Sequence, residues 1–212
     1  MSLYLDSALI AEAQFARQLG WVSGITTNPT LLAQSELSPE ETLRELASSH
    51  HGEVFYQLTA PDLEGKQREA HQIQNILGQA TVLKIPATLE GFQAVARLSP
   101  ELTCAVTAIY SPAQAAVAAA AGAKYAICYV NRATRLLGDG LALVRGMAKV
   151  LSGTSTEILA ASLRSPEEAV ATLLAGAQHL TLPLKVLREL NEHELSEAAM
   201  AEFARTGCGI EY

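Results

Sequence analysis

The sequence predicts an α/β fold, a (β/α)8 TIM barrel with an extra C-terminal helix. Short apolar segments of strand length alternate with amphipathic helical segments through most of the 212 residues. Several strand segments are apolar on both faces, which is typical of parallel strands buried on both sides. The expected strands cover residues 3–6, 22–26, 53–57, 81–85, 102–107, 125–130, 157–161 and 179–182.

The segments between these strands carry recognisable helix ends. Ser7 is expected to begin the first helix, which Gly20 ends. Ser38-Pro39-Glu40-Glu41 combines an N-cap residue, a proline at the first helical position and acidic residues in the first turn. Ser165-Pro166-Glu167-Glu168 repeats this pattern. These signals support helices between consecutive strands, as a (β/α)8 barrel requires.

The chain is expected to form one barrel domain over residues 1–212, because no linker or low-complexity segment interrupts it. Residues 194–212 are expected to form a C-terminal helical tail after the eighth βα unit. In a barrel whose own helices are complete, an added helix often packs against a neighbouring subunit. This organisation favours a homo-oligomer.

The composition narrows the possible functions. The net charge of −7 argues against a general nucleic-acid binder, although a few local arginines could still bind a small anionic substrate. The three cysteines are widely spaced and form neither a disulfide framework nor a zinc signature, which fits a cytoplasmic protein. No signal peptide, membrane span or membrane partner is expected.

Polar side chains occur where seven of the eight expected strands end. Active sites of (β/α)8 barrels lie at the C-terminal ends of the strands, so these residues are candidates for catalysis and binding. The structural alternative is that strand ends are polar because loops begin there. The candidates are Asp6, Thr26, Asn28, Gln57, Lys84, Thr107, Tyr129, Asn131, Arg132, Ser162 and Arg164.

Lys84 differs from the other four lysines because it lies inside an expected strand. Lys66, Lys124 and Lys149 are expected to be solvated, and Lys185 is a weaker candidate at the start of a helix. A buried, unpaired ammonium is costly, so Lys84 must be paired, reach solvent or be neutral. Pairing with a carboxylate on the next strand is the structural alternative to a neutral amine.

A neutral lysine is a nucleophile. At an unperturbed pKa near ~10.4, only about one lysine in 2,500 is neutral at pH 7, and burial that lowers the pKa toward ~7–8 raises this fraction several-hundred-fold. Such an amine can attack a ketone and form a Schiff base, whose iminium accepts electrons when the neighbouring C–C bond breaks. Lys84 is therefore the candidate nucleophile of a Schiff-base aldolase.

Six segments resemble the small transaldolase and fructose-6-phosphate aldolase family, in order and at matching spacing over nearly the whole chain. The most specific are the Thr-Thr-Asn-Pro segment at residues 24–30 and the Lys-Ile-Pro segment at residues 83–88. The resemblance implies a class I aldolase on a (β/α)8 barrel, without a metal or other cofactor. It also implies a homo-oligomer, a pentamer or a decamer built from two pentameric rings. The other four segments are Leu5-Asp6, Thr107-Ala108-Ile109-Tyr110, Tyr129-Val130-Asn131-Arg132 and Ala160-Ala161-Ser162.

The resemblance implies roles for the residues at matching positions. Lys84 is the Schiff-base lysine, and Asp6 handles the proton of the substrate C4 hydroxyl during retro-aldol cleavage. Asn28 orients the substrate hydroxyls, and Thr26 supports its loop from behind. The implied substrates are dihydroxyacetone and a sugar phosphate.

The phosphate of that substrate has three candidate ligands. Arg132 and Ser162 match the family's phosphate-binding positions, and Arg164 is close enough in sequence to assist. A guanidinium is always charged and binds phosphate through two parallel hydrogen bonds. The segment at residues 133–140 departs from the family pattern by an extra arginine, which could alter how the sugar phosphate enters.

Three residues separate the two activities of the family. Around the catalytic water, the family's aldolases have Gln and Tyr, whereas its transaldolases have Glu and Phe. This chain resembles the aldolases, because it has Gln57 and Tyr129 at these positions, and Thr107 is the third residue of the set. A tyrosine hydroxyl bound to water can donate and accept protons, as general acid–base chemistry requires. The resemblance therefore favours an aldolase that cleaves or forms fructose 6-phosphate, with a transaldolase as the alternative. The structural alternatives are a polar layer for Gln57 and a core aromatic for Tyr129.

Three other readings compete with a Schiff-base aldolase: a metal-dependent aldolase, a non-enzymatic binding protein and a nucleotide enzyme. A metal-dependent enzyme is disfavoured because the five histidines do not have ligand spacing; His50 and His51, for example, are adjacent. A non-enzymatic sugar-phosphate-binding barrel could use Arg132 and Ser162. It has no need for Lys84, Asp6 and Tyr129 together, so their joint presence argues for an enzyme. No glycine-rich phosphate loop follows an expected strand, which disfavours a nucleotide enzyme.

Overall fold

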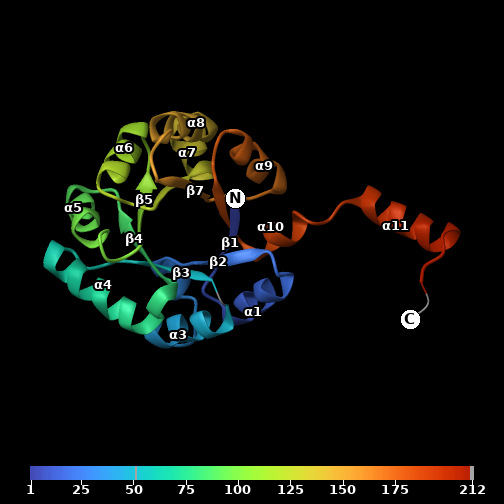
Figure 1. The fold of residues 1–212 in the computed structure, drawn as a ribbon, viewed down its shortest axis with the longest axis horizontal. Coiled ribbons are helices and arrows are strands. Elements are labelled where there is room, and N and C mark those ends of the chain that lie inside the picture. Colours follow the sequence, from blue (N-terminus) through green and yellow to red (C-terminus); the bar gives the residue numbers. More distant parts are fainter. Residues whose placement is uncertain (51, 211–212) are drawn as a thin grey trace.

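The computed structural model describes residues 1–50 and 52–210, and it confirms the barrel (Figure 1). Eight parallel strands pair in chain order, and β8 closes the barrel by pairing with β1. The strands are β1 (Ser2–Asp6), β2 (Val22–Thr26), β3 (Glu53–Gln57), β4 (Thr81–Pro86), β5 (Cys104–Ile109), β6 (Tyr125–Tyr129), β7 (Glu157–Ala161) and β8 (His179–Leu182).

Helices follow the strands along the chain, and all of the described helices except the last, α11, lie around the barrel. They are α1 (Ile10–Leu19), α2 (Pro29–Leu32), α3 (Pro39–Ser49), α4 (Leu63–Leu77), α5 (Leu89–Leu98), α6 (Pro112–Ala120), α7 (Val130–Leu137), α8 (Gly140–Leu151), α9 (Pro166–Leu174), α10 (Leu184–Glu189) and α11 (Glu194–Thr206), with a 3-10 turn, η1 (Gly78–Ala80), before β4.

The predicted bounds of β2, β3, β7 and β8 are confirmed, but those of β5 are wrong by two residues. The backbone N–H of Leu102 donates to the carbonyl of Leu98 at 2.9 Å, so residue 102 belongs to the turn after α5. Beyond Thr107 the strand continues through Ala108, whose φ of 60° produces an irregular register with β6. Val130, predicted to end β6, instead begins α7.

The predicted helix ends are confirmed with one exception. Ser38 forms a full capping box with Glu41, and Ser165 caps α9 through the backbone N–H of Glu168. Gly20 ends α1 with a φ of 74°. Ser7, however, accepts a hydrogen bond from the N–H of Leu9 at 3.1 Å, and the helix begins only at residue 10. A serine that forms a local turn gives the same sequence signal as an N-cap.

The prediction that Lys66 is solvated is wrong, because its side chain is buried. Its Nζ donates to the carbonyl oxygens of Ala60 and Pro61, the latter at 3.0 Å. The polar pattern of α4 could not show that the preceding loop folds back over this helix and offers carbonyl groups that need a donor.

Two apolar cores stabilise the barrel. The larger lies between the strands and the helices, and the smaller fills the interior of the barrel. A core on each side explains why the strands are apolar on both faces. The interior core comprises Tyr4, Phe55, Val82, Ala105, Tyr125, Ile127, Leu159 and Ala161, with Tyr129 packed against it.

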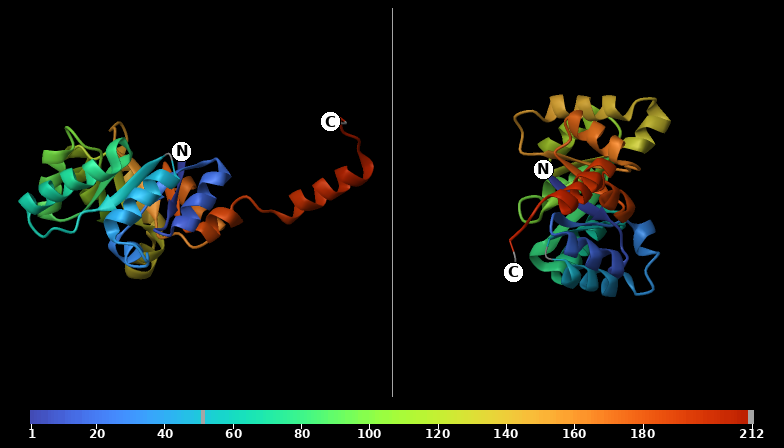
Figure 2. Two further views of the ribbon diagram at one scale, coloured as in Figure 1. Left: turned by 90° about the horizontal axis from the view of Figure 1, so that it is seen from below. Right: turned by 90° about the vertical axis from the view of Figure 1, so that its right-hand side faces the viewer.

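The predicted C-terminal helix is present as α11, and it extends away from the barrel (Figures 1 and 2). Within residues 194–206 no side chain is buried. Residues 211–212 of the predicted tail lie outside the described residues, as does His51. Among the described helices, none is long and apolar enough to cross a membrane.

Candidate active site

A cavity of about 480 Å³ lies where the strands end. It brings together eight of the eleven candidates for catalysis and binding, which come from β1, β2, β3, β4, β6 and β7 and from the segments that follow them. This end of a (β/α)8 barrel is where active sites form. The lining residues are Asp6, Thr26, Asn28, Pro29, Thr30, Leu31, Gln57, Lys84, Ile127, Tyr129, Arg132, Ala161, Ser162 and Thr181.

Lys84 reaches this cavity from β4 and is only 4% exposed. Its Nζ donates a hydrogen bond to the carbonyl oxygen of Thr27 at 2.7 Å. Burial lowers the pKa of Lys84, and the carboxylate of Asp6 partly opposes that shift. No ion pair among the described residues includes Lys84. A buried amine with a lowered pKa and a neutral partner is poised to be deprotonated.

Asp6 ends β1 and lines the same cavity. The hydroxyl of Thr26 donates to its Oδ1 at 2.8 Å and lies 2.5 Å from the hydroxyl of Thr181. Burial raises the pKa of Asp6, while Lys84 and the Thr26 hydrogen bond oppose the rise. A carboxylate with a raised pKa is a stronger base than a solvated one, and the two threonines fix its orientation.

Tyr129 ends β6 and forms a second polar group in the cavity. Its hydroxyl lies 2.7 Å from the hydroxyl of Thr107, which is buried behind the cavity on β5. Burial raises the pKa of Tyr129, and this hydrogen bond opposes the rise. The phenol therefore stays protonated and can donate a hydrogen bond to a bound water. Gln57, from β3, lines the cavity with it.

The cationic side of the cavity is provided by Arg132, on the first turn of α7. Its guanidinium carbon lies 4.7 Å from the centre of the Tyr129 ring. Ser162 directly follows β7 and has a φ of 60°. Its carbonyl accepts a hydrogen bond at 3.0 Å from the N–H of Asn131, the residue before Arg132. This contact joins the segment after β7 to the start of α7. A guanidinium and a hydroxyl together suit a phosphate group.

Of the three predicted phosphate ligands, Arg164 is the one that does not line the cavity. Its side chain is exposed, and its backbone N–H donates to Oε2 of Glu168 at 2.8 Å. Asn28 lines the cavity, and its Oδ1 accepts a hydrogen bond from the N–H of Leu31 at 3.0 Å as the N-cap of α2. Its amide nitrogen is thus the atom that remains to donate to a ligand.

Thr181 is a cavity residue that the sequence analysis missed. It comes from β8, the one expected strand for which no polar end was identified. The signal was available in the strand itself: polar His179 and Thr181 alternate with apolar Leu180 and Leu182, so one face of β8 is polar. The apolar part of the lining comprises Pro29, Leu31, Ile127 and Ala161.

Comparison with known proteins places these residues in a wider group. The model of the family described as Transaldolase/Fructose-6-phosphate aldolase matches residues 3–209. Probable transaldolases of Coprothermobacter proteolyticus and Aquifex aeolicus are each 35% identical to this chain. The first alignment covers 96% of this chain and 94% of the relative, and the second 97% and 95%.

Solved structures with the same architecture are much more distant in sequence. Orotidine 5'-monophosphate decarboxylase from Metallosphaera sedula superposes with a TM-score of 0.65 at 15% identity, covering 90% of this chain and 98% of the decarboxylase. A mandelate oxidase variant superposes with a TM-score of 0.63 at 17% identity, covering 98% of this chain and 75% of the oxidase. These similarities confirm the barrel fold alone.

Proposed function

The chain belongs to the transaldolase/fructose-6-phosphate aldolase family, and on that premise we propose that it is a Schiff-base aldolase acting through Lys84. The reaction is the cleavage of fructose 6-phosphate to dihydroxyacetone and glyceraldehyde 3-phosphate, and its reverse. The observation that carries the proposal is one cavity that holds a buried amine, a buried carboxylate and a guanidinium, from Lys84, Asp6 and Arg132.

The reaction begins at the ketone of the sugar. The neutral Nζ of Lys84 attacks C2, and loss of water from the resulting carbinolamine leaves a protonated iminium. The lowered pKa of Lys84 supports this step because it increases the neutral fraction of the amine. The carbonyl of Thr27, 2.7 Å from Nζ, orients the amine without competing for its lone pair.

Bond cleavage requires a base at C4. The carboxylate of Asp6 accepts the proton of the C4 hydroxyl, the C3–C4 bond breaks, and its electron pair moves into the iminium to form an enamine. Glyceraldehyde 3-phosphate then leaves. The raised pKa of Asp6 suits this role, because a stronger base accepts the proton more readily. Asn28, with its amide nitrogen free to donate, would orient the sugar hydroxyls.

Release of dihydroxyacetone requires a proton and a water molecule. The enamine carbon takes a proton to regenerate an iminium, and water attacks that iminium to free the ketone and Lys84. The Tyr129 hydroxyl, held by Thr107 at 2.7 Å, and the Gln57 side chain would hold this water. Arg132 and Ser162 would bind the phosphate, and the exposed side chain of Arg164 leaves it at most an outer role.

Transfer of the dihydroxyacetone unit to another aldose phosphate is a second candidate activity. It is favoured by the two relatives named probable transaldolase. Both activities use the same enamine, and they differ in whether its carbon takes a proton or attacks the aldehyde of an acceptor sugar; water then hydrolyses the resulting iminium in either case. The presence of Gln57 and Tyr129 in the cavity favours protonation in this chain.

Trapping of the intermediate tests the central claim. The protein is incubated with fructose 6-phosphate, reduced with borohydride, digested and examined by mass spectrometry. A dihydroxyacetone-sized adduct on Lys84 is expected, and Lys84→Ala should abolish it. No adduct on the native protein would leave a sugar-phosphate-binding barrel as the better explanation, and an adduct that survives Lys84→Ala would place the nucleophile elsewhere.

A second assay separates the two activities. Free dihydroxyacetone is measured from fructose 6-phosphate alone and again with erythrose 4-phosphate as acceptor. The proposed aldolase releases dihydroxyacetone in both cases. Turnover that requires erythrose 4-phosphate would identify a transaldolase instead.

We further propose that the protein is a cytoplasmic homo-oligomer, a pentamer or a decamer. The three cysteines are unpaired, which fits a reducing compartment. Helix α11 extends from the barrel and exposes Leu195, Met200 and Phe203 by 68%, 65% and 64%. Packing of α11 against a neighbouring subunit would bury these side chains.

A further inference from the structure

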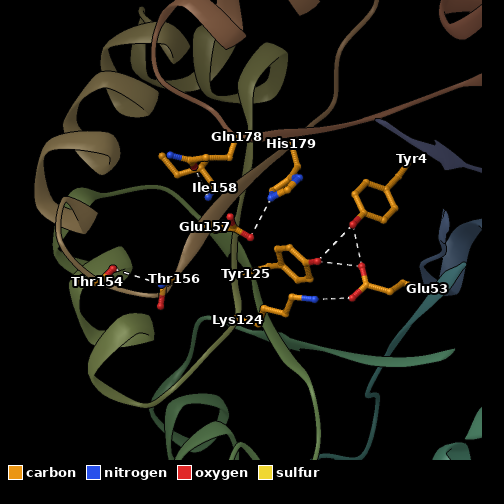
Figure 3. Close-up of polar contacts among 10 residues, drawn as sticks. All are labelled: Tyr4, Glu53, Lys124, Tyr125, Thr154, Thr156, Glu157, Ile158, Gln178 and His179. Carbon is orange, nitrogen blue, oxygen red and sulfur yellow. Dashed lines mark hydrogen bonds and ion pairs between the residues drawn. The ribbon is translucent and has the colours of Figure 1, made fainter. Parts of the chain in front are cut away.

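A polar network lies at the opposite end of the barrel from the cavity, where the strands begin (Figure 3). The carboxylate of Glu53 is its centre. Oε2 accepts hydrogen bonds from the hydroxyls of Tyr4 at 2.7 Å and Tyr125 at 2.8 Å, and Oε1 pairs with Nζ of Lys124 at 2.7 Å. The two tyrosine hydroxyls are 3.2 Å apart. Three donors therefore converge on one carboxylate.

The network joins strands that are not neighbours. Tyr4 belongs to β1, Glu53 to β3 and Tyr125 to β6, whereas the barrel's backbone ladder links only strands adjacent in the order β1 to β8. The rings add packing across the same gap, because Phe55 lies 5.3 Å from the Tyr4 ring and 5.4 Å from the Tyr125 ring. Both tyrosines are 2% exposed. These contacts therefore connect opposite walls of the barrel through its interior.

The three joined strands are the ones that end in the residues proposed for proton transfer and for binding the catalytic water. Asp6 follows Tyr4 by two residues on β1, Gln57 follows Glu53 by four on β3, and Tyr129 follows Tyr125 by four on β6. Even separations place the members of each pair on the same face of a strand. At about 3.3 Å per residue, the network lies roughly 7–13 Å below the residues it would position. Lys84, on β4, is outside this set.

We infer that Glu53 is a positioning residue for the proton-transfer steps of the aldolase. Its hydrogen bonds hold β1, β3 and β6 together at one end of the barrel. They thereby fix the relative positions, along the barrel axis, of Asp6, Gln57 and Tyr129 at the other end. The inference rests on the proposed function. Catalytic groups must be held closely in place, since a misplacement of about 1 Å can reduce the rate by up to about 100-fold.

A neighbouring pair at the same end of the barrel provides a matched control. Oε2 of Glu157, on β7, lies 3.0 Å from Nε2 of His179, on β8 (Figure 3). These two strands are already joined by the backbone ladder, and neither ends in Asp6, Gln57 or Tyr129. The His179 ring also packs against the rings of Tyr4 and Tyr125, and Glu157→Gln leaves that ring in place. Loss of the Glu157 charge should therefore affect folding stability without affecting proton transfer.

The test compares Glu53→Ala, Glu53→Gln and Glu157→Gln in the full-length enzyme with fructose 6-phosphate as substrate. For Glu53→Ala we expect kcat to fall about tenfold, KM to stay within about twofold, and the equilibrium yield of borohydride-trapped Lys84 adduct to be unchanged. Glu53→Gln should recover most of kcat, because its amide oxygen can still accept from both tyrosines. Glu157→Gln should leave kcat within about twofold even where it lowers Tm.

Several results would overturn the inference. They are a kcat unchanged in folded Glu53→Ala, an equal loss of kcat in Glu157→Gln, or a loss of adduct yield in parallel with kcat. If Glu53→Ala does not fold, Tyr125→Phe replaces it, because this variant removes the hydrogen bonds of the Tyr125 hydroxyl with Glu53 and Tyr4 and retains the ring contacts. In that variant kcat should fall about threefold, and an unchanged kcat refutes the inference. A native protein that forms no adduct refutes the proposed function itself, irrespective of Glu53.

Discussion

At the scale of single residues, burial shifts the two central ionisable groups in complementary directions. Desolvation lowers the pKa of Lys84 and raises that of Asp6, and each group's charge partly opposes the other's shift. The lysine becomes a better nucleophile and the carboxylate a better base in the same environment. Neither change requires a metal ligand or a special sequence motif, only a cavity that excludes most water from both groups.

Asp6→Asn tests the role of the carboxylate. The amide cannot accept the C4 proton, so kcat for cleavage of fructose 6-phosphate should fall by about 100- to 10,000-fold. The variant should still form a trappable Lys84 adduct, because the ketone and the amine are unchanged. The measurements are steady-state kinetics and borohydride trapping, and a variant with native kcat would remove Asp6 from the mechanism.

The raised pKa of Asp6 also predicts a pH dependence for the native enzyme. The carboxylate acts as a base only when ionised, so kcat should fall as the pH drops through the pKa of Asp6. Because this pKa is raised, the acid limb of the kcat profile should lie above the ordinary aspartate value of about 3.9. An acid limb at or below that value would show that another group controls the rate.

Arg132→Ala tests the phosphate site. The variant should raise KM for fructose 6-phosphate by about 10- to 100-fold, the equivalent of one or two charge-assisted hydrogen bonds, and change the reaction of unphosphorylated glyceraldehyde with dihydroxyacetone much less. Arg164→Ala is the matched comparison, since its side chain is exposed and outside the cavity. Equal effects of the two substitutions would mean that charge near the cavity, rather than a specific contact, attracts the substrate.

Tyr129→Phe tests whether the enamine is protonated and hydrolysed or instead attacks an acceptor sugar. The ring should keep its contacts with Arg132 and Tyr110, while the hydroxyl bound to Thr107 is lost. Release of free dihydroxyacetone should fall by about tenfold or more, and transfer to erythrose 4-phosphate should fall less. The measured quantity is the ratio of the two rates, and an unchanged ratio would exclude Tyr129 from water handling.

At the scale of elements, the strands were the most predictable part of the chain. Runs such as the one around Lys84 are apolar on both faces, and parallel strands with a core on each side demand this pattern. The errors occur where a residue is held by an adjoining loop or by neighbouring strands rather than by its own helix or strand. Ser7 and Lys66 are both engaged by local loop geometry, and the left-handed conformation of Ala108 depends on its neighbouring strands.

The candidate site was predictable to a similar extent and for the same reason. Residues at strand ends could be grouped because the carboxyl ends of parallel strands meet at one end of a barrel. What the sequence could not provide is pairing: that Thr26 orients Asp6, that Thr107 holds Tyr129, or that Lys84 contacts a backbone carbonyl. These contacts follow from the register of strands that are far apart in the chain.

At the scale of the whole molecule, the barrel interior is layered from one end to the other. A polar network of Glu53, Tyr4 and Tyr125 lies where the strands begin, an apolar layer follows, and the polar cavity lies where the strands end. The apolar layer separates the two polar ends, so it excludes water from the ionisable groups of the cavity on the side that faces the barrel interior. The interior of the barrel thus contributes to the pKa shifts on which the proposed chemistry depends.

Helix α11 lies outside this layered structure, and its apolar side chains need another partner. Leu195, Ala199 and Phe203 recur at a spacing of four residues and share one side of the helix. Burial of each large apolar side chain against a neighbouring subunit would contribute about 1.5–3 kcal/mol and would favour association. We therefore predict that Phe203→Asp dissociates the oligomer into smaller species.

Light scattering coupled to size-exclusion chromatography measures this effect directly. The full chain should have a mass several times that of the 22.5 kDa protomer, and Phe203→Asp should shift it toward that value at micromolar concentration. Glu197→Ala, on the other side of the same helix, is the control and should leave the mass unchanged. Because the cavity is lined only by barrel residues, the dissociated variant should still form the Lys84 adduct. A native chain that is monomeric would show that α11 has another partner, and a dissociated variant without adduct would show that assembly supports the cavity.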